Sequence, residues 1–181
     1  GATMHQEIIE FWFNEIDSSK WFIKDTGFDR LIIDRFSEVH TQAVAGELFP
    51  WRTTASGSLA EIIVLDQFSR NMFRDTPQSF THDTLALALA QSAIEKGFDT
   101  ELSEEKRPFF YLPFMHSESL MIHTEAERLY AQLGNPSSAE FEHKHKIIIE
   151  RFGRYPHRNE VLGRISTPEE KMFLTSPDSG F

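Results

Sequence analysis

The chain has 181 residues, 40% of them hydrophobic, with a formal net charge of −10, and this length predicts one domain with a sizeable core. The acidic charge argues against a general nucleic-acid binder and against adsorption to anionic membranes, so we expect neither partner. The absence of cysteine excludes disulfides and thiol nucleophiles and suits a cytoplasmic protein, and no apolar run approaches the ~20 residues of a membrane span.

The spacing of apolar residues predicts an all-α fold. We interpret residues 1–3, which precede Met4, as an expression remnant. No stretch alternates as a half-buried strand would, so we expect a single helical domain over 4–175 and a flexible tail at 176–181. In chain order, helices are predicted at residues 4–15, 28–48, 58–74, 81–96, 117–133, 137–152 and 167–174. A further helix is predicted to open at Ser103 and to be bent or broken at Pro113.

The predicted helix 58–74 organises the rest of the chain. Ser58 followed by Glu61 has the spacing of a capping box. The segment is apolar nearly all round, which is typical of a buried helix. Asp66 and Arg70 nevertheless lie on an apolar stripe, one turn apart. Because a buried charge is costly unless it is paired, we expect these two to meet each other or other charged partners.

Positive charge is concentrated in the stretch 151–164. Arginine forks bind carboxylate and phosphate in a bidentate fashion, which indicates an anion site. Alternatively, these arginines pair with buried carboxylates such as Asp66 and cap helix C-termini, and both interpretations can hold together. The residues concerned are Arg151, Arg154, His157, Arg158 and Arg164.

Two further histidines could carry chemistry. His145 lies on an apolar helix face, where it is either a hydrogen-bonded core residue or a catalytic base. His116 and Glu118 stand at a helix start, where they could supply a base and its orienting partner or simply form the helix N-terminus. Their spacing of two does not place both on one helix face, so no metal site is predicted. No known nucleotide or cofactor motif occurs, and no cofactor is expected.

Six motifs follow one another along the chain in a recognisable order. They are Trp21-Phe22 with Asp25, Leu65-Asp66-Gln67-Phe68 with Arg70-Asn71, Tyr111-Leu112-Pro113-Phe114 with His116-Ser117-Glu118, the stretch 151–159, Leu162-Gly163-Arg164, and the stretch 166–170. Together these motifs resemble the bacterial family known as domain of unknown function 924. Two positions differ from the family pattern: Ser69 replaces a proline and Tyr155 a phenylalanine. The resemblance implies an all-helical fold similar to tetratricopeptide-like helical hairpins, and it implies no activity.

Three functional hypotheses follow from these residues. The first is a binding module with an arginine-lined pocket for an anionic small molecule or peptide. The second is a protein–protein interaction scaffold whose polar network is structural. The third is a hydrolase-like enzyme with His116 or His157 as general base. Neither the ligand, nor catalysis, nor the oligomeric state follows from the residues. The expected ligand-binding residues are Asp66, Arg70, Asn71, His116, Glu118, Arg154, His157 and Arg158.

Overall fold

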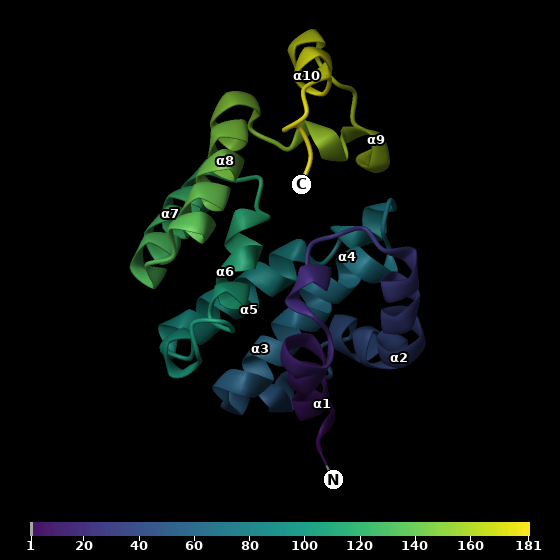
Figure 1. The fold of residues 1–181 in the computed structure, drawn as a ribbon, viewed down its shortest axis with the longest axis vertical. Helices are drawn as coiled ribbons and strands as arrows, with labels where there is room; N and C mark the ends of the chain where they lie inside the picture. The colour runs from purple at the N-terminus through teal and green to yellow at the C-terminus, as the bar shows by residue number, and fades with distance from the viewer. Residues whose placement is uncertain (1) are drawn as a thin grey trace. The chain divides into compact units, whose positions relative to one another are not determined.

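The computed structural model describes residues 2–181, which form α, 3₁₀ and π helices and, over that range, no strand (Figure 1). The all-α prediction is therefore confirmed. No helix among these residues is both long and apolar enough to cross a membrane. The α-helices are α1 (Met4–Glu10), α2 (Thr26–Val44), α3 (Ala55–Ile63), α4 (Ser69–Met72), α5 (Asp83–Glu95), α6 (Pro108–Met115), α7 (Leu120–Leu133), α8 (Pro136–Phe152), α9 (Asn159–Leu162) and α10 (Pro168–Phe173).

Shorter 3₁₀ and π segments connect or extend these helices. Two π segments, η1 (Phe11–Glu15) and η4 (Val64–Phe68), continue α1 and α3 without a break. The 3₁₀ segments are η2 (Ser18–Lys20), η3 (Phe49–Thr53), η5 (Pro77–Ser79), η6 (Asp99–Glu101) and η7 (Pro156–Arg158).

The chain divides into two compact units. Unit 1 comprises the residues up to 74 together with 78–113, and unit 2 comprises 75–77 and 114–181. The predicted single-domain boundaries, the flexible tail and the tetratricopeptide likeness stay predictions.

Aromatic rings fill the core of unit 1. Phe36 lies between Phe11 and Phe68, with 4.9 Å between ring centroids on either side. Trp12 packs edge-on against Phe68 and Phe109, at 5.7 and 6.0 Å. The first four of these rings are fully buried and Phe109 is nearly so. Such ring pairs add about 0.5–1.5 kcal/mol each beyond the area they bury, so this cluster is a main source of the unit's stability.

The central helix is buried as predicted but begins earlier. Every residue of the range 57–69 is buried. The N-cap is Thr54, whose side chain accepts a hydrogen bond from the Gly57 amide, so residues 55–57 are helical and not the expected loop. The predicted capping box is wrong, because Ser58 lies inside α3 and Glu61 instead binds Arg52.

Two other helix ends agree with the sequence prediction, whereas several helix starts, and the end of α2 at Val44, do not. The capping box of Thr167 with Glu170 is present, and Gly134 ends α7 in the left-handed conformation, with φ of 76°. In contrast, α8 begins at Pro136, because Asn135 and not Ser137 is its N-cap. The helix predicted from residue 103 starts only at Pro108.

Thr3, which belongs to the expected expression remnant, is the N-cap of α1. Its side chain accepts a hydrogen bond from the Gln6 amide, and the Gln6 side chain accepts one from the Thr3 amide. Thr3 therefore forms the capping box of α1. Gly1 lies outside the described residues.

Unit 2 is built around the antiparallel pair α7 and α8, joined by the tight turn at Gly134 and Asn135 (Figure 1). Ile148, Ile149 and Tyr155 form a buried cluster beside this pair, with Phe152 and Phe173 packed against it. The same region contains the histidines and arginines that the sequence singles out.

Candidate functional site

The eight predicted site residues are divided between the two units. Asp66, Arg70 and Asn71 belong to unit 1. The other five, from the stretches 116–118 and 154–158, belong to unit 2. Each group is described within its own unit.

In unit 1, Arg70 is held between two carboxylates. Its Nη1 lies 3.1 Å from Asp66 Oδ1, and its two terminal nitrogens donate to Asp83 at 2.8 and 2.9 Å. Gln67 Nε2 donates to the second oxygen of Asp66 at 2.8 Å. The Asp66 side chain is only 1% exposed, so these contacts supply the pairing that a buried carboxylate needs. The predicted Asp66–Arg70 pair is thus confirmed.

Asn71 belongs to a second polar cluster of unit 1. Its Nδ2 donates to Asp29 Oδ1 at 2.9 Å, and Arg74 Nε donates to Asp29 Oδ2 at 2.7 Å. Asp29 and Arg74 were missed by sequence reasoning. The residues that Asp29 binds are 42 and 45 positions away along the chain, so no local pattern could indicate the contact.

The residues Asp66 and Gln67 lie in the π segment η4. A π bulge adds one residue to a helical turn and is frequent at functional sites. Here the segment continues directly into α4, which carries Arg70 and Asn71. The polar residues of the predicted motif thus lie in a π turn and in the short helix that directly follows it.

In unit 2, Arg154 binds a structural carboxylate. Its Nε and Nη2 donate to the two oxygens of Glu170 at 2.9 and 2.8 Å, and Nη2 also donates to the Ile165 carbonyl at 2.8 Å. The hydrogen bonds from Arg154 lower the pKa of Glu170 to about 2. Because Glu170 also closes the capping box of α10, this arginine anchors that helix.

Glu118 likewise has a structural environment. Its carboxylate accepts hydrogen bonds from Arg164 at 2.9 and 3.0 Å and from the Tyr155 amide at 2.7 Å. Burial alone would raise its pKa, but the hydrogen bonds from Arg164 and Tyr155 outweigh burial and lower the pKa. Glu118 is therefore an ionised tether between the start of α7 and the segment after α8.

Arg158 joins the two predicted motifs of unit 2. Its Nη2 donates to the His116 carbonyl at 2.9 Å, and its guanidinium lies 4.8 Å from the centre of the Tyr155 ring. The His157 ring also packs against the Tyr155 ring, with 5.6 Å between the two ring centroids. Residues 42 positions apart thus meet around Tyr155, and the arginine side chain is buried among them.

A buried network behind Tyr155 was missed by sequence reasoning. His123 Nδ1 lies 2.8 Å from Glu142 Oε2, and its Nε2 lies 2.6 Å from the Ser117 carbonyl. Tyr155 Oη donates to the Met115 carbonyl at 2.6 Å. Burial raises the pKa of Glu142. The available signal was two polar residues on the otherwise apolar inner faces of α7 and α8.

His145 agrees with the core-residue interpretation. Its Nδ1 donates to the Phe141 carbonyl at 2.7 Å, and the Phe181 ring stacks on it at 3.8 Å between centroids. Burial lowers the pKa of His145 to about 3. Such a histidine stays neutral at physiological pH and contributes packing.

The geometry of the described residues gives little support to a catalytic or a metal site. Over residues 2–181, no group of three or more histidine and acidic side chains is placed to hold a metal ion. His40 Nε2 and Ser69 Oγ are 2.7 Å apart, as in a nucleophile–base pair. Both residues are buried, however, and burial lowers the pKa of His40 to about 4, so this contact is structural.

Residues 8–178 match the family model described as bacterial protein of unknown function (DUF924). The chain is also similar to the solved structure of a protein of unknown function from Agrobacterium tumefaciens. The two share 41% sequence identity with a TM-score of 0.91, and the alignment covers 95% of this chain and 97% of that one. No curated protein matches the chain. These matches confirm the resemblance carried by the sequence motifs.

Proposed function

This chain belongs to the bacterial DUF924 family, and we propose that it is a cytoplasmic binding module for an anionic small molecule or peptide. The observation that carries the proposal is the meeting of two separately predicted motifs in unit 2. Arg158 donates to the backbone carbonyl of His116, and Arg158 and His157 both lie against the Tyr155 ring. A guanidinium and an imidazole on one aromatic ring suit a carboxylate or phosphate group.

The residues of this group have different tasks in the proposal. Arg154 and Glu118 hold the frame, because each is already engaged in paired charge-assisted hydrogen bonds. Recognition then falls to Arg158, His116 and His157. A contribution from Asp66, Arg70 and Asn71 stays a prediction.

A structural scaffold is the second candidate, and a specific observation favours it. In both units, arginines that were candidates for ligand binding are neutralised by carboxylates: Arg70 by Asp66 and Asp83, and Arg154 by Glu170. Such a network can fix the packing of helices that present a surface to a protein partner. The hydrolase hypothesis, with His116 or His157 as general base, stays a prediction without further support.

Thermal unfolding with a panel of phosphates, nucleotides, carboxylates and short peptides tests the proposal. A ligand at 100 times its Kd stabilises by about 2.7 kcal/mol, or roughly 5–10 °C for a chain of this size. Arg158→Lys keeps the positive charge but loses the planar fork. The control, Arg151→Lys, alters an arginine whose ion pair with Glu169 is exposed.

A stabilising ligand class whose effect is lost in Arg158→Lys and kept in Arg151→Lys would support the binding module. If no ligand stabilises the wild type while Arg158→Lys lowers Tm strongly, the cluster is structural. The search would then turn to protein partners.

A further inference from the structure

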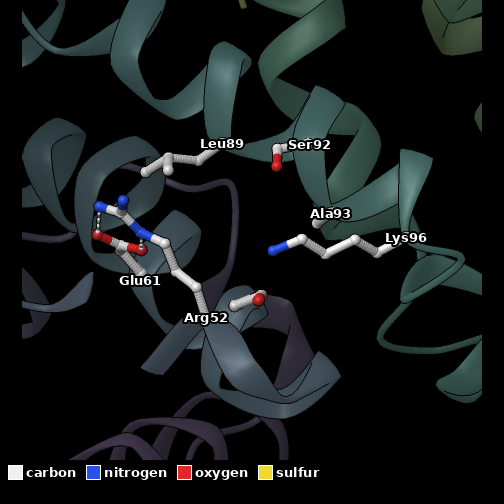
Figure 2. A pocket seen from close by; sticks show the side chains of 7 residues that line it. Arg52, Glu61, Leu89, Ser92, Ala93 and Lys96 are labelled. Atoms are coloured by element: carbon white, nitrogen blue, oxygen red, sulfur yellow. Dashed lines mark hydrogen bonds and ion pairs between the residues drawn. The ribbon is translucent and has the colours of Figure 1, made fainter. Parts of the chain in front are cut away.

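A small recess opens between α3 and α5 within unit 1, and no predicted site residue is among those that line it (Figure 2). It has a volume of about 230 Å³, counted to where it opens to solvent. This volume includes open solvent, and the enclosed part has room for little more than a water molecule, so a small group bound here would remain partly in solvent. Its lining residues are Arg52, Ser58, Glu61, Leu89, Ser92, Ala93 and Lys96.

Helical spacing explains why these side chains share one recess. Leu89, Ser92 and Lys96 follow each other at three- and four-residue steps along α5 and its C-cap, which places them on one face. Ser58 and Glu61 have the same relation on α3. The two faces meet where α3 packs against α5.

One of the two cations in the recess is already neutralised. Arg52 Nε and Nη2 donate to the two oxygens of Glu61 at 2.7 and 2.8 Å, and the Glu61 side chain is only 1% exposed. This bidentate contact fixes the guanidinium at the wall of the recess and leaves its Nη1 unused by Glu61. The buried carboxylate is thereby satisfied and requires no other cation.

Lys96 has no carboxylate partner among the described residues. Its side chain extends into the recess toward Arg52, as Figure 2 shows. The three charges of the lining, Arg52 and Lys96 against Glu61, leave one positive charge in excess. A small oxyanion of single charge would balance it.

The recess also has two hydroxyl groups available as donors. Neither Ser58 nor Ser92 makes a side-chain hydrogen bond within residues 2–181. The hydroxyl of Ser92 lies near solvent, but Ser58 is 95% buried, since its exposed fraction is 5%. The Ser58 hydroxyl retains contact with solvent, so it is available to donate a hydrogen bond to a bound group.

We propose that the recess lined by Ser58, Ser92, Lys96 and Arg52 is a binding site for a small oxyanion such as phosphate or carboxylate. The ammonium of Lys96 would supply the main ionic contact, and the two hydroxyls would donate hydrogen bonds to the oxygens. Glu61 would act as a positioning residue through Arg52. This site lies outside the residues of the proposed function and does not depend on it.

Titration of the isotope-labelled full chain with inorganic phosphate, followed by backbone amide NMR, tests the site. Saturating shifts at Ser58, Ser92 and Lys96 are the expected result. Acetate serves as the carboxylate probe, and chloride at equal ionic strength controls for salt. Lys96→Gln removes the charge at an exposed position and should not disturb folding, whereas Lys171→Gln removes an equal charge in unit 2.

Lys96→Gln should weaken phosphate binding by about tenfold or more, as expected for the loss of one charge-assisted hydrogen bond. Lys171→Gln should leave it unchanged. Shifts that chloride reproduces, or binding that both variants retain equally, would overturn the proposal. Arg158→Lys should not affect these shifts, so failure of this site and failure of the unit 2 site can be told apart.

Discussion

Replacing Gly57 by alanine tests how tightly η3 is fixed against α3. A Cβ at this position would lie 2.2 Å from the Trp51 carbonyl oxygen and 3.0 Å from its carbonyl carbon. Both atoms belong to the backbone, so no side-chain rotation relieves the overlap. Either η3 or the first turn of α3 must move by on the order of 1 Å, about the difference between 2.2 Å and an ordinary carbon–oxygen contact.

The expected free-energy change combines two opposing contributions. Gly57 has a helical φ, so alanine itself is favourable there by about 0.5–1 kcal/mol. Overpacking that forces backbone shifts costs about 1–3 kcal/mol or more, and contact with a backbone carbonyl belongs at the upper end. We therefore expect Gly57→Ala to lower the free energy of unfolding by about 2–2.5 kcal/mol, equivalent to roughly 4–10 °C in Tm.

Urea unfolding at pH 7, with Gly27→Ala as the matched control, measures this difference. Gly27 also lies in the first turn of a helix, but its added Cβ would be 3.4 Å from the Asp25 carboxylate, an ordinary contact. Gly27→Ala should thus be neutral or stabilising. The reasoning is refuted if Gly57→Ala proves as stable as the wild type with an unchanged m-value.

Two further predictions concern titrating groups of unit 2. Arg154 holds the pKa of Glu170 at about 2, below the ordinary 4.5. The Arg154–Glu170 ion pair therefore stabilises the folded chain fully above about pH 4.5, and this stabilisation is lost as the pH falls toward 2. Glu170→Gln should therefore lower Tm at pH 7, with a deficit that shrinks at pH 2; a constant deficit would contradict the assignment. Phe181→Ala should let water reach His145 and raise its pKa from about 3 toward 6.5. An NMR titration checks this shift, with the exposed His143 as internal control, and an unmoved His145 signal would show that the ring does not exclude water.

The helices and several of their ends could be predicted because their signals are local. Gly134 ends a helix in a conformation that favours glycine, and Thr167 with Glu170 forms its capping box within one turn. The same local rule failed at Ser58 and Glu61. There, Thr54 four residues earlier supplied the cap, and Glu61 was drawn to Arg52 nine positions away.

The polar partners could be predicted only where they lie one helical turn apart. Asp66 and Arg70 are such a pair. Asp29 with Asn71, or His123 with Glu142, depend on which helices pack together, and 28 acidic residues compete for each cation along the chain. The sequence therefore indicated that buried charges must be paired without indicating their partners.

Whether a cationic side chain is already paired with a carboxylate decides how easily an anion can bind to it. An anion that recruits Arg154 must compete with Glu170, whose side chain is only 2% exposed and whose pKa of about 2 keeps it ionised. Drawing the arginine away would leave that carboxylate buried and unpaired, which is unfavourable. Lys96 needs no such exchange, because its ammonium has no carboxylate partner among the described residues and lies 5.6 Å from the centre of the Phe98 ring, a weaker contact than a buried ion pair. A cluster of arginines in a sequence is thus weaker evidence for an anion site than one lysine in a recess, and this ordering predicts that phosphate binds at Lys96 before it perturbs Arg154.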